Sequence, residues 1–405
     1  MILKSDIEKI SGLQMEVVRS ADKGLTRESL SDLPRLGKHA LIITGIRRCG
    51  KSTLLFQLFA SGYPDAFYLN FSDNRLYGFE NADFTRLDEI IKESGSKVLF
   101  FDEIQEIEGW DRYVRQKLDE NFRLAITGSN ASLLGRELGT KLTGRHISRE
   151  LFPFSFSEYL KYSGSLMVAE SFISYMKAGG FPEYLNAGRD EILSDLFEDI
   201  LIRDIVVRYG IRDIKGLQRL ALYLVSNIGK PVTGGRLKQS VGISATSTIL
   251  EYFSHLESAY LFFFVPRFSY SVKSQMVSPR KVYAIDTGLV NVNSASFTDD
   301  TGRKLENMIY TFLRRCNKSI FYWSGKNECD FIVMRKGEKP LIIQVCSDLN
   351  RDNLDRELKG INEAAEFFKV RSAFILTLNQ SDDINYANVN VKVVPAWKFI
   401  STLQP

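Results

Sequence analysis

The 405-residue sequence is poor in the residues that build structural metal sites. Its four cysteines, at positions 49, 316, 329 and 346, are scattered along the chain, and so are its three histidines, at positions 39, 146 and 255. Neither set has the paired spacing that holds a structural zinc ion. We therefore expect no zinc site, and the few dispersed cysteines fit a reducing, cytoplasmic environment.

Long hydrophobic runs and a strong excess of charge are also missing. The apolar run Leu261–Val265 is far shorter than a membrane-spanning segment, and the first residues, MILKSDIEKI, contain no long apolar stretch and no cleavage-site pattern. We therefore expect no targeting segment and no membrane partner. The formal net charge of +4 neither requires nor excludes nucleic acid, and 405 residues leave room for two or three domains.

The most informative stretch is Leu41–Leu55, LIITGIRRCGKSTLL. A short apolar run predicts a buried strand, the next segment fits G-x-x-x-x-G-K-[ST] in full, and an apolar helix pattern follows. In this context the loop's backbone N–H groups and the helix N-terminus bind phosphate. Lys51 is expected to reach the terminal phosphates and the Ser52 hydroxyl to bind Mg²⁺. The predicted nucleotide-binding residues are Gly45, Ile46, Arg47, Arg48, Cys49, Gly50, Lys51, Ser52 and Thr53.

Cys49 lies inside this loop, close to the Lys51 charge and to the start of the helix. Both features lower the pKa of a thiol. We therefore expect a reactive thiol that bound nucleotide protects from alkylation.

From residue 40 onward, short apolar runs alternate with helical patterns. Strands are predicted at 67–71, 98–101 and 124–126, and helices at 84–93 and 110–119. This alternation is typical of an α/β fold with a doubly wound parallel sheet, in which ligands bind at the carboxyl ends of the strands. Gly45, Asp102 and Thr127 each follow a predicted strand, so we expect them to meet at one edge of the sheet.

Two adjacent acids, Asp102 and Glu103, close the predicted strand 98–101. Asp102 is placed to hold Mg²⁺ through water, and Glu103 to polarise an attacking water. Adjacent carboxylates repel unless a cation is near, and the alternative is a pair that faces solvent. No Asn-Lys-x-Asp segment follows, so guanine selectivity is not indicated and ATP is the expected nucleotide.

Four segments occur in the order GIRRCGKSTLL, FFDEIQEIEGW, AITGSNASLL and LTGRHISRELFPFSFSEYL. Together they resemble the AAA+ class of P-loop ATPases, in particular a bacterial and archaeal subfamily whose C-terminal half is uncharacterised. The resemblance runs from about residue 20 to the C-terminus. It implies a further strand between the P-loop strand and the strand that ends in Asp102, and it suggests assembly into homo-oligomeric rings.

The resemblance also implies residues that respond to the γ-phosphate. A polar sensor is expected after the fourth strand, and the candidates are Thr127, Ser129 and Asn130. Arg145, which follows Gly144, would sense the γ-phosphate or act on a neighbouring subunit; the alternative is a surface salt bridge. Arg136 is a weaker candidate.

The rest of the chain divides into three predicted parts after the P-loop domain of residues 1–150. Residues 151–215 form a helical lid or connector. Residues 216–300 show helices at 217–228, 233–241 and 245–258 and two β-type runs around a polar loop, which is a winged-helix order. DNA contact there would use Thr246, Ser247 and Thr248, with Arg236, Lys238, Lys273, Arg280 and Lys281 nearby. The alternative is a winged helix used only for packing.

Residues 301–405 show a helix, three strands, a helix and a strand, an order that resembles the PD-(D/E)XK nuclease fold. Glu306 and Asp330 supply two acids, but the Glu-x-Lys of that family is replaced by Gln344-Val345-Cys346. Mg²⁺ needs anionic oxygen ligands, and a thiol cannot replace an ammonium beside phosphate. We therefore expect a nuclease-like fold without nuclease chemistry, whose surface binds a nucleic-acid backbone or a protein partner.

Three functions remain open at this stage. The favoured one is an ATPase that couples Mg²⁺-dependent ATP hydrolysis to movement of the C-terminal domains, with Glu103, Lys51 and the sensor residues in the catalytic site. The second is a nucleotide-gated DNA-binding protein with slow turnover. The third is an ATP-driven nuclease, against which the Gln344/Cys346 pair argues.

Overall fold

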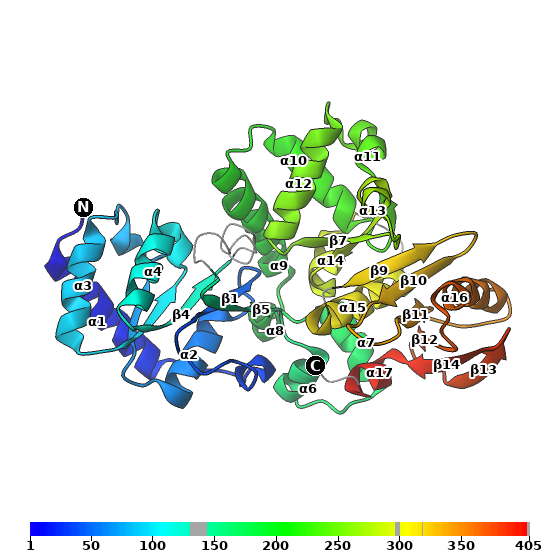
Figure 1. The fold of residues 1–405 in the computed structure, drawn as a ribbon, viewed down its shortest axis with the longest axis horizontal. Helices are drawn as coiled ribbons and strands as arrows, with labels where there is room; N and C mark the ends of the chain where they lie inside the picture. Colours follow the sequence, from blue (N-terminus) through cyan, green and yellow to red (C-terminus); the bar gives the residue numbers. More distant parts are fainter. Residues whose placement is uncertain (130–143, 296–299, 318, 403–405) are drawn as a thin grey trace. The chain divides into compact units, whose positions relative to one another are not determined.

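The computed structural model describes residues 1–129, 144–295, 300–317 and 319–402 (Figure 1). The chain divides into two compact units, Met1–Phe152 and Pro153–Pro405. Asn130 and Arg136, two of the predicted sensor residues, lie outside the described residues. No helix within the described ranges is long and apolar enough to cross a membrane.

The first unit is built on a parallel five-stranded sheet in the order β2-β3-β4-β1-β5. Its strands are β1 (Ala40–Gly45), β2 (Phe67–Asn70), β3 (Val98–Asp102), β4 (Arg123–Gly128) and β5 (His146–Leu151). The predicted α/β fold with a parallel sheet is confirmed, and β4 lies between the P-loop strand and the strand that ends in Asp102, as the resemblance implied. The edge strand β5 was not predicted.

Helices cover both faces of this sheet because successive side chains of a strand point to opposite faces. The helices are α1 (Lys4–Ser20), α2 (Lys51–Gly62), α3 (Asp83–Ser94) and α4 (Trp110–Asp119), with short 3₁₀ turns at η1 (Glu28–Leu30), η2 (Asn74–Leu76) and η3 (Ile104–Glu106). Ile42, Leu99 and Phe101 join the core cluster that contains residues of α1, α3 and α4. On the other face, Phe59 of α2 packs edge-on against Phe100, with ring centroids 6.0 Å apart.

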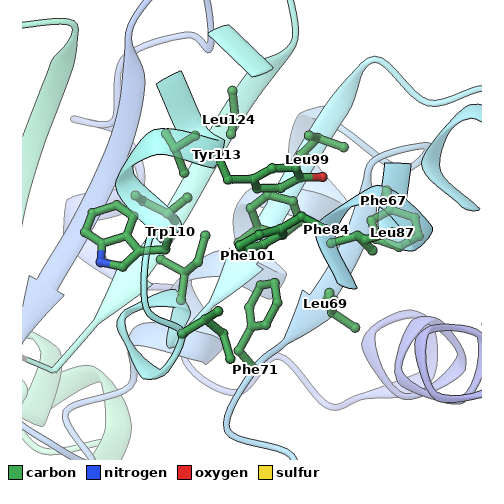
Figure 2. Packing of buried hydrophobic residues seen from close by; sticks show 14 of the residues in the cluster. Phe67, Leu69, Phe71, Phe84, Leu87, Leu99, Phe101, Trp110, Tyr113 and Leu124 are labelled. Atoms are coloured by element: carbon green, nitrogen blue, oxygen red, sulfur yellow. The ribbon is translucent and has the colours of Figure 1, made fainter. Parts of the chain in front are cut away.

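Aromatic rings dominate the core under α3 and α4 (Figure 2). Phe84 of α3 and Tyr113 of α4 stack with ring centroids 4.0 Å apart, and Phe101 of β3 lies 6.1 Å from Tyr113. Each buried aromatic side chain stabilises the fold by about 1.5–3 kcal/mol. This packing fixes β3 beneath two helices and so fixes the position of the acids at its carboxyl end.

The second unit begins with helices and a small antiparallel sheet. Its first part contains α6 (Phe156–Ser163), α7 (Ala169–Ala178), α8 (Pro182–Ala187), α9 (Asp190–Asp199), the π-helix η5 (Ile200–Val207), α10 (Ile214–Val225), α11 (Gly234–Val241) and α12 (Thr246–Ser258). The strands β6 (Pro231–Val232), β7 (Phe262–Pro266) and β8 (Arg280–Ala284) pair in the order β6-β8-β7. Between β7 and β8 lies a short helix, α13 (Val272–Val277), where a polar loop was predicted. The prediction of a polar loop was wrong, because these residues form a helix and expose several apolar side chains.

The remainder of the second unit is a six-stranded sheet with helices. The strands are β9 (Ile320–Ser324), β10 (Glu328–Val333), β11 (Leu341–Val345), β12 (Ser372–Thr377), β13 (Asp382–Tyr386) and β14 (Val389–Pro395), in the order β13-β14-β12-β11-β10-β9. The helices are α14 (Thr287–Asn293), α15 (Thr301–Cys316), α16 (Leu354–Phe368) and α17 (Ala396–Thr402). Glu306 lies on α15, Asp330 on β10 and Gln344 on β11.

Candidate nucleotide site

The loop between β1 and α2 has the backbone of a phosphate cradle. Gly45 has φ 152° and Gly50 has φ 97°, conformations that side chains rarely adopt. A Cβ at Gly45 would also lie 2.1 Å from the carbonyl oxygen of Leu151 at the end of β5. The helix then begins at Lys51, so the loop's N–H groups and the N-terminus of α2 face the same place.

Lys51 lies along this loop and is only 5% exposed. Its ammonium donates to the carbonyls of Gly45 and Ile46, each at 3.2 Å. The same nitrogen lies 3.6 Å from a carboxylate oxygen of Glu103. The structure therefore brings the P-loop lysine and the predicted catalytic acid together, although they are far apart in sequence.

Asp102 is fully buried at the end of β3. Its carboxylate accepts hydrogen bonds from the Tyr68 hydroxyl at 3.0 Å and from the Thr127 hydroxyl. Burial, followed by the charge of Glu103, raises the pKa of Asp102. The hydroxyl groups of Thr127 and Ser52 act in the opposite direction and lower it. Ser52 and Asp102, the two predicted Mg²⁺ residues, therefore lie near one another.

Glu103 adopts a left-handed backbone conformation, φ 51°, which is costly for a residue with a side chain. Its N–H donates to the Thr127 hydroxyl oxygen at 3.0 Å, and its carboxylate accepts from Gln105. Burial alone would raise the pKa of Glu103, but the Lys51 ammonium and the Gln105 amide outweigh it and the pKa is lowered. Glu103 is therefore ionised at neutral pH.

Thr127, at the end of β4, bridges the two acids. It donates to the Asp102 carboxylate and accepts from the Glu103 N–H, so a single buried hydroxyl joins the side chain of one acid to the backbone of the other. Ser129 is also buried, one residue beyond the strand end at Gly128. Of the predicted sensor positions, Thr127 has the clearest structural role.

The oxygen donors at this site suit Mg²⁺. The ion prefers hard oxygen ligands, keeps several waters and takes few protein ligands beside phosphate oxygens. The Asp102 carboxylate and the Ser52 hydroxyl meet that requirement. Across the described residues, no group of three or more His, Cys, Asp and Glu side chains is arranged to hold a metal ion, so the remaining Mg²⁺ ligands would be phosphate and water.

Arg145 does not lie near the P-loop of its own chain. Its carbonyl accepts the N–H of Ala40 at the amino end of β1, whereas the P-loop follows the carboxyl end of that strand. Six residues of strand separate the two ends, which is roughly 17–20 Å. The guanidinium forms an ion pair with Asp119 at 2.6 Å. The structure thus matches the surface salt-bridge alternative, and a sensor role in the same chain is wrong.

Two contributors to the site were missed in the sequence. Arg27 is buried and donates to the carbonyl of Cys49 in the P-loop and to the carbonyl of Phe152, both at 2.8 Å. No motif marks Arg27, and only the folded chain brings it beneath the loop. Tyr68 lies in a predicted strand, but its contact with Asp102 depends on the pairing of β2 with β3.

The Cys49 thiol is buried rather than exposed to the phosphate site. Its sulfur lies 3.4 Å from the carbonyl oxygen of Leu151, to which it donates. Burial raises the pKa of Cys49, and the charges of Lys51 and Arg27 offset this effect only in part. The prediction of a reactive thiol with a lowered pKa is wrong.

We expect Cys49 to resist alkylation in the folded protein, because a buried neutral thiol is a poor nucleophile. Iodoacetamide labelling followed by peptide mass spectrometry would measure this, with the exposed Cys316 as the internal comparison. In urea both cysteines should label. Native labelling of Cys49 as fast as that of Cys316 would contradict the burial argument.

The acids predicted at Glu306 and Asp330 surround a lysine. Lys281 of β8 is 2% exposed, and its ammonium lies 3.0 Å from Glu306, 2.8 Å from Glu328 and 2.8 Å from Asp330. The prediction that Lys281 contributes to a DNA-binding surface is therefore wrong. Gln344 accepts the Asp330 N–H at 3.1 Å. Cys346, whose pKa is raised to about 11 by burial, cannot supply a cation. This arrangement gives the nuclease alternative no support.

Replacing Lys281 with methionine should lower the free energy of unfolding by about 3–5 kcal/mol, because it leaves buried carboxylates without their cation. Burial and the Asp330 charge already raise the pKa of Glu306 to about 7. A raised carboxyl pKa favours the protonated acid in the folded state, so the deficit should shrink as the pH falls below about 7. Urea unfolding at several pH values would measure both effects.

Lys273→Met, at an exposed lysine of α13, is the matched control and should change the free energy of unfolding little. Adding Glu306→Gln and Asp330→Asn to Lys281→Met should recover most of the loss. A deficit under about 1 kcal/mol for Lys281→Met would show that the ammonium is not needed.

Comparison with known proteins bears on both halves of the chain. Residues 37–160 match the family described as an AAA domain, and residues 169–300 match a family described as a domain of unknown function. An uncharacterised protein of Methanocaldococcus jannaschii is 33% identical over 396 residues, covering 89% of this chain and 88% of that protein. An uncharacterised protein of Haemophilus influenzae is 32% identical over 330 residues, covering 76% of this chain and 82% of that protein.

Solved structures with some likeness include three at low similarity. The Orc1 protein of Aeropyrum pernix in complex with DNA is 11% identical with a TM-score of 0.30, over 72% of this chain and 92% of that one. AMPPCP-bound DnaA of Aquifex aeolicus is 15% identical with a TM-score of 0.28, over 62% of this chain and 88% of that one. The RuvB Holliday junction branch migration motor of Thermotoga maritima is 17% identical with a TM-score of 0.30, over 65% of this chain and 90% of that one. TM-scores of this size do not bear on function. The long alignment shows that this chain belongs to the same family as the uncharacterised Methanocaldococcus protein, and the family match shows that it carries an AAA domain at residues 37–160.

Proposed function

We propose that the protein binds ATP with Mg²⁺ at the P-loop, hydrolyses it, and couples turnover to movement of the second unit. The observation that carries this proposal is one connected group of side chains. Lys51 contacts Glu103, the Glu103 N–H contacts Thr127, Thr127 contacts Asp102, and the nearby Ser52 hydroxyl lowers the pKa of Asp102. This connection supports phosphate binding, metal binding and water activation at the carboxyl end of three neighbouring strands.

Each group has a distinct role in this proposal. The loop N–H groups and the Lys51 ammonium bind the phosphates and stabilise charge on them. Glu103 is ionised and orients and polarises the attacking water, while Thr127 fixes its position relative to Asp102. Bound Mg²⁺, held through Asp102 and Ser52, would neutralise charge on the phosphate oxygens. Buried surroundings strengthen each of these electrostatic interactions.

Coupling to the second unit is supported by contacts within the first unit. The P-loop contacts the last residues of that unit three times: Gly45 packs against the Leu151 carbonyl, Cys49 donates to it, and Arg27 joins the Cys49 and Phe152 carbonyls. Phe152 is the last residue before the second unit. A change of loop conformation on ATP binding or hydrolysis would therefore act directly on the chain that leads to Pro153.

The proposal extends to partners and assembly. Thr246 and Ser247 are exposed at the start of α12, and Arg236 and Lys238 are exposed on α11. A winged-helix contact with DNA phosphates is therefore proposed there, without the buried Lys281.

A nucleotide-gated DNA-binding protein with slow turnover is the second candidate function. Arg145 remains a candidate for action on a neighbouring copy. The free cysteines fit a cytoplasmic protein.

Lys51→Ala should weaken ATP binding by roughly 100-fold, because it removes the ammonium that pairs with the terminal phosphates. Calorimetric titration with ATP and Mg²⁺ would measure it. Lys38→Ala, at an exposed lysine just before β1, is the matched control and should bind normally. Retained affinity in a folded Lys51→Ala protein would refute the P-loop assignment.

Glu103→Gln should keep ATP affinity but lower turnover by about 10²–10⁴-fold, since the amide keeps the shape and loses the base. A coupled phosphate-release assay would follow turnover. Glu108→Gln, at an exposed carboxylate on the same segment, should turn over at the wild-type rate. If Glu103→Gln lost less than about tenfold, another group would have to activate the water.

A further inference from the structure

A cluster of six aromatic side chains in the second unit runs from the core to the surface. This ring cluster consists of Phe268, Tyr270, Phe321, Trp323, Phe367 and Phe368. Phe268 is buried and lies at its base, with ring-centroid distances of 4.7 Å to Phe368, 5.4 Å to Phe321 and 5.3 Å to Tyr270. The cluster joins the segment after β7, strand β9 and the end of α16, so its position is fixed by three elements.

The outer rings of the cluster remain open to solvent. Tyr270 is 79% exposed and Phe367 is 42% exposed. Their rings stack at 5.6 Å with an interplanar angle of 30°, and the Trp323 ring lies 4.6 Å from that of Phe367. The adjacent helix α13 adds the exposed apolar side chains Val272, Met276 and Val277. Exposed stacked rings with further exposed apolar side chains only a few residues away along the chain favour a binding role.

Positive side chains flank the outer rings. Arg267 precedes Phe268, Lys273 lies on α13, Lys326 follows the end of β9 and Lys369 follows Phe368, and all four are exposed. Basic groups therefore accompany each of the segments that supply rings.

The acids near the rings are already hydrogen-bonded. The Glu363 carboxylate accepts the backbone N–H groups of Lys326 at 2.9 Å and Asn327 at 2.8 Å, and the indole N–H of Trp323 at 3.3 Å. Glu366 accepts from Asn362 at 2.8 Å. These bonds also fix the β9–β10 turn: a Cβ at Gly325 would lie 1.6 Å from the Glu363 carboxylate. The surface is therefore rigid at Trp323.

We propose that the ring cluster binds single-stranded nucleic acid. Exposed ring faces offer stacking platforms to unpaired bases, and flanking lysines and arginines meet the phosphates. A duplex hides its base faces, so the rings favour a single strand over a duplex. This site uses other residues than those at the start of α12 and adds an activity that does not depend on ATP turnover.

The test uses the full chain and a fluorescent deoxythymidine oligomer of about 20 nucleotides, followed by anisotropy at low salt without ATP. The wild type should bind, and its affinity should fall as the salt concentration rises. In a plot of the logarithm of the binding constant against the logarithm of the salt concentration, each phosphate contact should contribute about −0.7 to the slope. Tyr270→Ala should weaken binding about 5- to 150-fold, the loss of one stacked base. Lys273→Ala with Lys326→Ala should lower the slope by about 1.4.

Control variants distinguish the ring cluster from binding elsewhere on the chain. Tyr77→Ala, at a tyrosine of the first unit that is 92% exposed, should bind like the wild type. Lys9→Ala with Lys92→Ala, at exposed lysines of α1 and α3 in the first unit, should also leave oligomer binding unchanged, and a duplex of equal length should compete poorly. These measurements contain no ATP, so their results would stand even if the protein proved not to hydrolyse ATP.

Two outcomes would overturn the proposal. One is no binding of the oligomer by the wild type at low salt, or unchanged binding by a folded Tyr270→Ala variant. The other is a change of oligomeric mass in Tyr270→Ala, measured by light scattering, without a change in oligomer affinity. That result would assign the ring cluster to contact between copies of this chain.

Discussion

Buried charge at the carboxyl end of β3 is the constraint on which the first unit depends. A carboxylate that is fully removed from water, such as Asp102, is costly unless hydrogen bonds and cations offset the loss of solvation. The hydroxyl groups of Tyr68 and Thr127 donate to it, and the Ser52 hydroxyl also lowers its pKa, so three different segments meet that need. The parallel sheet is what brings those segments to one edge. Core packing under α3 and α4 therefore serves the site by holding β3 in place.

The second unit meets the same constraint in a different way. Glu306, Glu328 and Asp330 approach one another on α15 and β10, and the cation that offsets their charge is the ammonium of Lys281. Because this lysine comes from β8, the small antiparallel sheet and the large mixed sheet share one buried ion cluster. The acids predicted for residues 301–405 thus form part of an ion cluster that connects two sheets.

The strands, the P-loop and the adjacent acids could be predicted because their signals are local. Short apolar runs, a glycine loop and a strand-end acid pair depend only on neighbours in sequence, and β1, β2, β3 and β4 coincide with the predicted runs. The edge strand β5 could not be predicted, since its stability comes from pairing with β1 and its own residues alternate little between polar and apolar. Helix α13 was missed because its apolar side chains are exposed, which hid the usual helical burial pattern.

The sequence by itself determined the fold class, the phosphate loop and the identity of the acids beside it, because those features depend on residues within one short segment. Only the tertiary structure decided which charges are buried and what they contact. Cys49 is buried, and its thiol donates to the Leu151 carbonyl instead of facing the phosphate site. Arg145 lies at the wrong edge of the sheet for a sensor, and Lys281 neutralises acids instead of meeting DNA. Burial and charge pairing depend on residues far apart in the chain, so no local pattern records them.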